Sequence, residues 1–151
     1  MRKKTIIFSV IGLVVIAGGI YGYKEYTRGQ VDLENVKPQV TISAADLIKE
    51  FETNEEAANK KYLPKEEFII EVNGDIREVK KDDGGKYTVV LKGAEGTMSS
   101  VQCAVDSTHN KEVTTLQPGT PVHIKGVVTG FNADELVGSD VFLARSVVAQ
   151  H

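Results

Sequence analysis

The chain has a single cysteine, Cys103, so it cannot form an intramolecular disulfide. An oxidising compartment would therefore add no covalent cross-link to the fold. The same count excludes a lipoprotein anchor, because Cys103 lies far from the N-terminal position that such an anchor needs. Cys103 alternates with Val101 and Val105, which is typical of a buried structural residue in a strand and not of a reactive thiolate.

A basic excess is also lacking in the part of the chain beyond residue 23. All 21 acidic residues but only 15 of the 18 basic residues lie there, which leaves this part with a formal net charge of −6. A surface that binds nucleic acid through its phosphates needs the opposite sign. The charge therefore argues against nucleic acid as a partner.

Signatures of catalysis are lacking as well. The sequence contains no nucleophile and base pair, no phosphate-binding glycine loop and no metal-binding motif. His109, His123 and His151 are scattered without the spacing of metal ligands, and His123 shares the outward face of its expected strand with Lys125, where we expect a solvated imidazole. We therefore predict a protein that is not an enzyme and that uses no cofactor and no metal.

Only one long apolar run is present, at residues 5–23. Nineteen helical residues at about 1.5 Å each reach roughly 28 Å, close to the hydrocarbon thickness of about 30 Å. Tyr21, Tyr23 and Tyr26 gather at the far end, where tyrosine rings favour the headgroup layer. We expect residues 5–23 to form a single transmembrane helix.

The flanks of this run set its orientation. Arg2, Lys3 and Lys4 stand directly before it, so residues 1–4 are expected in the cytoplasm. The run then acts as a signal anchor in the inner (cytoplasmic) membrane of a bacterium, and the rest of the chain is periplasmic or otherwise outside the cytoplasm. The alternative is a cleaved secretory signal, with residues 17–19 as its processing site.

A linker and a helix are expected next. Residues 24–42 are polar, contain Pro38 and are expected to act as a tether, although Val40 and Ile42 could pack on the domain as a first strand. Ser43 and Asp46 have the spacing of a helix cap. Apolar residues then recur on one helical face until Pro64, namely Leu47, Ile48, Phe51, Ala58 and Tyr62. We predict one amphipathic helix that ends before Pro64.

After Pro64 the apolar pattern becomes alternating and predicts five strands. They lie near residues 68–76, 87–91, 101–105, 122–128 and 140–148, with a tight turn at 83–84 and a short helix near 109–116. Gly74 and Gly126 occupy inward positions midway along the first and fourth strands, where glycine usually marks a sharp bend. Five short strands, two of them bent, and a helix before the fourth predict a mainly β, five-stranded OB-fold barrel within residues 43–148.

Several blocks of sequence support this fold by resemblance. They are Ser43–Leu47, Asn54–Tyr62, Glu71–Ile76, Asp82–Gly85, Val101–Cys103, Leu116–Gly119 and Val122–Gly126. In this order they resemble the tRNA-anticodon-binding-like (tRNA_anti-like) family of bacterial OB-fold proteins. The resemblance implies a small exported or membrane-anchored protein of undefined activity, and it supplies no catalytic residues. The loop at 131–139 is longer and more acidic than is usual in such proteins.

Binding is the function that remains. We expect a non-catalytic, membrane-held module for a protein or small-ligand partner. The alternative is a nucleic-acid-binding OB domain, for which Tyr87 with Lys86 and Lys92 on the second strand are the ligand-binding candidates. The ending at His151 is also reminiscent of a periplasmic haem chaperone, but the tyrosine that follows the histidine in that family is missing here. Gly74, Gly126 and Cys103 are interpreted as structural.

Overall fold

The computed structural model describes residues 12, 14–23, 32–63 and 67–149. The chain divides into two compact units, Met1–Asp32 and Leu33–His151. In the first unit residues 14–23 are helical, while most of the rest of the expected 5–23 span, its basic flank and Tyr26 lie outside the described residues. Within the described ranges, no helix combines the length and the apolar character needed to cross a membrane.

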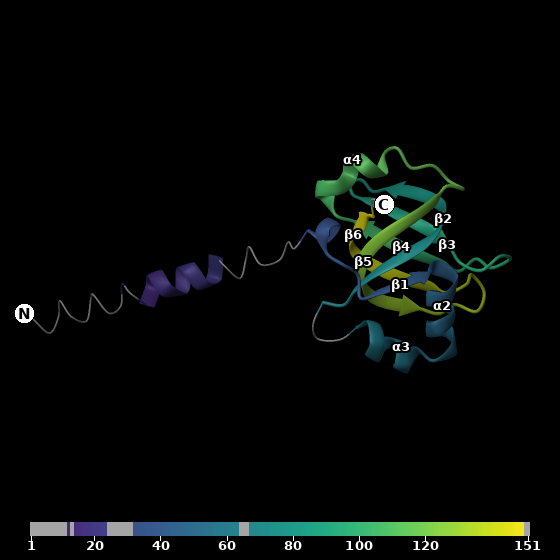
Figure 1. Cartoon of the computed structure of the whole chain (residues 1–151), viewed down its shortest axis with the longest axis horizontal. Coiled ribbons are helices and arrows are strands. Elements are labelled where there is room, and N and C mark those ends of the chain that lie inside the picture. Colours follow the sequence, from purple (N-terminus) through teal and green to yellow (C-terminus); the bar gives the residue numbers. More distant parts are fainter. Residues whose placement is uncertain (1–11, 13, 24–31, 64–66, 150–151) are drawn as a thin grey trace, which may run out of the picture. The chain divides into compact units, whose positions relative to one another are not determined.

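A closed, OB-like barrel of five strands forms the second unit (Figure 1). The strands are β2 (Ile69–Lys81), β3 (Tyr87–Lys92), β4 (Ser100–Val105), β5 (Pro121–Asn132) and β6 (Asp140–Val148). Their order around the barrel is β2-β3-β4-β6-β5, and β5 closes it by pairing with β2. Neighbours are antiparallel except β4 and β6, which are parallel. The prediction of a mainly β fold with a five-stranded barrel is confirmed.

Two short elements before the barrel belong to the same unit. Strand β1 (Val40–Ser43) runs parallel to β2 along residues 70–73. The 3-10 helix η1 (Leu33–Asn35) buries Leu33 against Ile69 and Val147. The described part of the expected tether at 24–42 therefore packs on the barrel from Leu33 onward.

The predicted single helix is in fact two, which corrects the expectation. Helix α2 (Ala44–Thr53) and helix α3 (Glu55–Tyr62) are separated by Asn54, whose φ of −158° and ψ of 91° are extended. The Asn54 side chain accepts a hydrogen bond from the amide of Ala57 at 3.0 Å and so caps α3. The expected cap of α2 is present, because Ser43 Oγ accepts from the amide of Asp46 and donates to its carboxylate.

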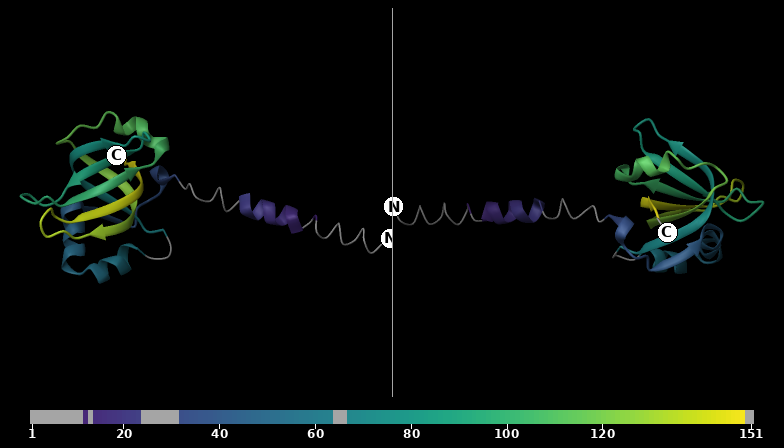
Figure 2. Two further views of the ribbon diagram at one scale, coloured as in Figure 1. Left: turned by 180° about the vertical axis from the view of Figure 1, so that it is seen from behind. Right: turned by 45° about the horizontal axis from the view of Figure 1, so that its top comes forward.

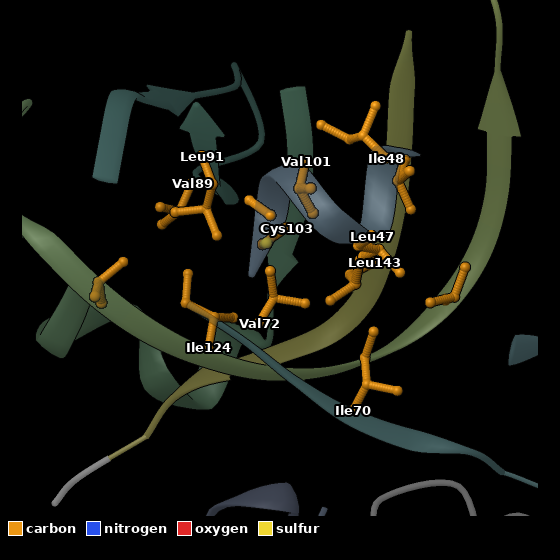
Figure 3. Close-up of a cluster of buried hydrophobic side chains, with 14 of the residues drawn as sticks. Leu47, Ile48, Ile70, Val72, Val89, Leu91, Val101, Cys103, Ile124 and Leu143 are labelled. Atoms are coloured by element: carbon orange, nitrogen blue, oxygen red, sulfur yellow. The ribbon is translucent and has the colours of Figure 1, made fainter. Parts of the chain in front are cut away.

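Helices cover both ends of the barrel. Helices α2 and α3 lie at one end, and η2 (Ser107–His109) with α4 (Asn110–Val113) lies at the other, as the blue and green segments of Figure 2 also show. The interior is filled by aliphatic side chains from every strand and from α2 (Figure 3). At the α2 end, Phe51 stacks on Tyr62 and on Phe131, with ring centroids 5.8 and 5.0 Å apart. The site must therefore lie on the outside of the barrel.

Candidate functional site

A cleft of about 630 Å³ opens beside the middle of β2 and is called the outer cleft below. Its lining comes from three segments: the start of α2, the middle of β2, and the end of β3 with the loop that follows it. The lining residues are Ser43, Ala44, Ala45, Asn73, Gly74, Asp75, Arg77, Lys92, Gly93, Ala94, Glu95, Gly96, Thr97 and Met98. Of the candidates named from the sequence, Lys92 and Gly74 lie here.

The cleft exists because β2 changes partners along one edge. Strand β1 pairs with β2 up to Asn73, and β3 pairs with it only from Ile76. Between them, Gly74 and Asp75 have a strand partner only on the β5 side. A Cβ at Gly74 would lie 3.2 Å from the Cβ of Ala44, so glycine lets the start of α2 approach β2 closely. Gly74 thus lies in the wall of a cleft, and the register shift of β2 against β3 comes after it, between Ile76 and Glu78.

Arg77 fixes the loop that forms the opposite wall. Its guanidinium donates to the carbonyl oxygens of Met98 at 2.8 Å and Ser99 at 3.1 Å. The loop also closes on itself, because the amide of Gly93 donates to the carbonyl of Ser99 at 3.0 Å. Hydrogen bonds from a charged donor are stronger than neutral ones, although the bond to Met98 is at an exposed position and only the bond to Ser99 is half-buried. The wall is therefore part of the fold and is not a loose flap.

Charges of both signs meet in the outer cleft. Lys92 is exposed, and its side chain has no hydrogen-bond or ion-pair partner in the part of the chain that the structure describes. Asp75 and Glu95 supply carboxylates to the same lining. No histidine, cysteine or tyrosine is among the described lining residues. The lining therefore offers two cationic side chains and two carboxylates, with Ser43 and Thr97 as further hydrogen-bonding groups.

The three ligand candidates named from the sequence are not brought together. Tyr87 begins β3 and Lys92 ends it, so they are roughly 17 Å apart along the strand. Lys86 is exposed in the turn between β2 and β3, where its amide donates to Asp82. Only Lys92 belongs to the cleft.

Tyr87, the stacking candidate on the second expected strand, is only partly accessible. The side chain is half-buried and packs against the main hydrophobic core, and Lys81 Nζ lies 5.5 Å from its ring centroid. Phe142 of β6, to which no motif in the sequence points, is also half-buried and lies opposite Gln102 of β4 and Gly130 of β5.

The structural interpretation of Cys103 and Gly126 fits their surroundings. Cys103 is fully buried in the core, and burial raises the pKa of its thiol to about 12. Gly126 lies at a register shift between β5 and β6. A Cβ at Gly126 would lie 2.9 Å from Ser146 Oγ, so the barrel wall closes on a position that only glycine fills without displacement.

The histidines are not ligands of a common site within the described residues. His123 Nδ1 lies 3.0 Å from the carboxylate of the buried Glu71, while 43% of the His123 side chain is exposed, so the imidazole is in contact with solvent as expected and also has a carboxylate partner. His109 lies 3.4 Å from Glu112, and His151 is outside the described residues. No local pattern pairs Glu71 with His123, because 52 residues separate them in the chain.

The acidic loop after β5 forms a turn that is held by hydrogen bonds to the Asp134 side chain. Asp134 accepts hydrogen bonds from the amides of Leu136 and Val137, and these bonds lower the pKa of its carboxyl group. The turn holds Leu136 outward, where 95% of the residue is exposed. Its end is tied to the outer-cleft loop, because the amide of Ser139 donates to Ser99 Oγ.

Comparisons with known proteins agree on the fold. The tRNA_anti-like family profile matches residues 1–141. The crystal structure of a "putative nucleic acid-binding lipoprotein" from Klebsiella pneumoniae subsp. pneumoniae MGH 78578 is similar at a TM-score of 0.56 and 21% identity, over 73% of this chain and 91% of that one. Asparaginyl-tRNA synthetase of Entamoeba histolytica is similar at a TM-score of 0.41 and 14% identity, over 74% of this chain and 24% of that one. No curated protein matches the sequence.

Proposed function

This chain belongs to the tRNA_anti-like family, and we propose that it is a non-catalytic OB-fold module that binds a polar ligand or a segment of a partner protein in the outer cleft. One observation carries the proposal. Arg77 holds the loop at 93–98 beside β2, and the cavity of about 630 Å³ next to it is lined by Lys92, whose side chain has no partner among the described residues. A preformed cleft with a few placed polar groups is the usual form of a ligand site.

Membrane anchoring outside the cytoplasm is part of the same proposal. It rests on the apolar run at 5–23 and on the basic residues Arg2, Lys3 and Lys4 before it. Anchoring would confine the barrel to a thin layer above the bilayer, where the partners it meets are other envelope proteins and small solutes. A cleaved signal would instead release the same barrel.

The choice of binding over catalysis follows from the chemistry of the walls. Lys92 can pair with an anion, and Asp75 and Glu95 can pair with a cation or accept hydrogen bonds. These groups recognise a zwitterion, such as an amino-acid-like solute or a polypeptide segment. General acid–base catalysis is most efficient when the pKa of the catalytic group lies near the working pH.

Site-directed photo-cross-linking in native membranes tests the proposal. A photoreactive residue replaces Ala94 in the cleft of the full chain, or Lys111 on α4 as a control position. We expect a discrete adduct from position 94, reduced at least threefold by Lys92→Glu but not by the matched charge change Lys111→Glu. Identical adducts from both positions, or an adduct at 94 that is indifferent to Lys92→Glu, would disprove this assignment.

Nucleic-acid binding is the second candidate, and the presence of Arg77 and Lys92 on one side of the barrel favours it. The name of the similar Klebsiella protein points the same way. Against it stand the net charge of −6 beyond residue 23 and the core-facing ring of Tyr87. We expect no binding of a labelled single strand of about 20 nucleotides. Micromolar binding that weakens steeply with salt and is lost in Lys92→Glu, but kept in Lys111→Glu, would put this function first.

A further inference from the structure

Strand β1 is an edge strand whose free edge carries unused main-chain groups. Within residues 32–63 and 67–149, β1 pairs with β2 on one side and with no strand on the other. Unpaired main-chain groups at a sheet edge are a template for another strand. We propose that β1 accepts an extended segment of a partner protein as an added strand.

The direction of the hydrogen bonds identifies the groups at this edge. Pro121 lies opposite Asp75 in the β2–β5 ladder and has no N–H, so that pair exchanges no bonds. Hydrogen-bonded and non-hydrogen-bonded pairs alternate along an antiparallel ladder. Glu71 and Asn73 lie four and two residues before Asp75, so their N–H and C=O groups also point away from β5 and towards β1.

Those groups of β2 bond to alternate residues of β1. Val40 lies opposite Ile70, and in a parallel ladder a residue bonds to the neighbours of the residue opposite it. The main-chain groups of Glu71 and Asn73 therefore bond to those of Val40 and Ile42. The N–H and C=O of Thr41 therefore point to the free edge. The side chain of Thr41 is exposed as well.

A groove next to β1 supplies room for side chains of the added strand. It has a volume of about 540 Å³ and runs from Ile42 between α2 and α3. Its lining is Ile42, Asp46, Lys49, Glu50, Thr53, Asn54, Ala57, Ala58 and Lys61, and it shares no residue with the outer cleft. Side chains of a strand point alternately to its two faces, so every second residue of an added strand can enter such a groove.

The charges at the groove define the segment that fits. Lys61 is already bound to Glu50 at 2.9 Å, and the Asp46 carboxylate accepts from Ser43. Lys49 is exposed and has no side-chain partner in the described residues. The added strand should therefore carry an apolar residue for the groove between Ile42 and Ala58 and a carboxylate for Lys49. The occupant is a short, extended, acidic and apolar segment.

Selection of peptides against the full chain in detergent micelles provides the probe. Random ten-residue peptides displayed on phage are panned on the wild-type chain, with depletion on Thr41→Pro. Proline at 41 removes an edge N–H but leaves the β1–β2 bonds of Val40 and Ile42 in place. Thr41→Val is the matched control, because it keeps the N–H and the shape of the side chain.

We expect a selected peptide to bind Thr41→Pro at least tenfold more weakly than wild type and Thr41→Val within about twofold. Lys49→Glu should weaken acidic peptides at least fivefold. The peptide should also slow hydrogen exchange of the Thr41 amide in the wild-type chain, a readout that does not depend on any variant folding.

Three results would overturn the proposal. The first is a selection that yields no peptide protecting the Thr41 amide. The second is equal affinity for Thr41→Pro in a variant whose melting is unchanged. The third is dimerisation of the chain, measured by sedimentation, that Thr41→Pro abolishes, since the occupant would then be a second copy of β1.

Discussion

Replacing Gly126 with alanine tests the tightest point of the barrel wall. The new Cβ would lie 2.9 Å from Ser146 Oγ, 3.1 Å from Leu143 Cδ2 and 3.2 Å from the carbonyl oxygen of Ala144. Ser146 and Leu143 are both buried, and the third contact is main chain. None of these neighbours can move into solvent, so β5 and β6 must separate slightly.

The expected change in the free energy of unfolding follows from the usual effect of overpacking a core. An added methyl group in a filled core destabilises by about 1–3 kcal/mol, and alanine regains roughly 0.5–1 kcal/mol over glycine through chain entropy. The difference is about 0–2.5 kcal/mol. Because the added Cβ would lie only 2.9 Å from Ser146 Oγ, we expect a value within this range of about 1–2 kcal/mol lost in the free energy of unfolding. For a unit of about 120 residues this loss lowers Tm by about 4–8 °C.

Gly130→Ala is the matched control, because it makes the same change on the same strand where nothing lies within 4 Å of the added Cβ. It should leave Tm unchanged or raise it slightly. Thermal and urea unfolding of the Leu33–His151 unit, which contains both hydrophobic clusters, measure the pair. Equal Tm values for the two variants would show that Gly126 is not held in contact, and the argument for a closed wall at this position would fail.

Three further predictions follow from other residues. Asp106 accepts from the amide and hydroxyl of Thr108, which lowers the pKa of its carboxyl group. Its ionised form therefore stabilises the fold above the unfolded pKa of about 4, and this contribution is lost as pH falls through the lower folded pKa. Asp106→Asn should accordingly be less stable than wild type in urea at pH 7 and nearly equal to it at pH 2; a constant difference would contradict the assignment. Cys103 should react with a thiol reagent at pH 8 only in proportion to unfolding by urea, since burial raises its pKa to about 12, and prompt labelling of the native chain would contradict its burial. Protease added to intact spheroplasts should digest the barrel, whereas protection until lysis would reverse the expected orientation.

The strands were predictable because each buries one face against a single interior. Alternation over Ile70, Val72 and Ile76 and over Val101, Cys103 and Val105 marks residues that are indeed in the core. The break at Asn54 was not foreseen, because the apolar face of α2 continues in register into α3. An asparagine that caps a second helix leaves no gap in that pattern.

The candidate site was harder to predict than the fold. Alternation already placed Tyr87 on the same side as Val89 and Leu91, so its core contact was available from the sequence and should have outweighed its chemistry. The outer cleft could not be predicted from the sequence, because it depends on the residue of β2 at which pairing with β1 ends and the residue at which pairing with β3 starts. No local pattern around Arg77 signals that it reaches the carbonyls of Met98 and Ser99, some 20 residues later.

Both proposed binding surfaces arise from the shortness of β1. Because β1 pairs with β2 only to Asn73, it leaves the opening beside Gly74 that becomes the outer cleft. Because β1 has no second strand partner among the described residues, its other edge is free to accept a strand. The two surfaces share no lining residue, so their occupants can be separated by mutation. Lys92→Glu should reduce the cleft adduct and leave peptide binding intact, and Thr41→Pro should weaken peptide binding and leave the cleft adduct intact. If either variant removes both activities, the two surfaces are one site that spans the start of α2.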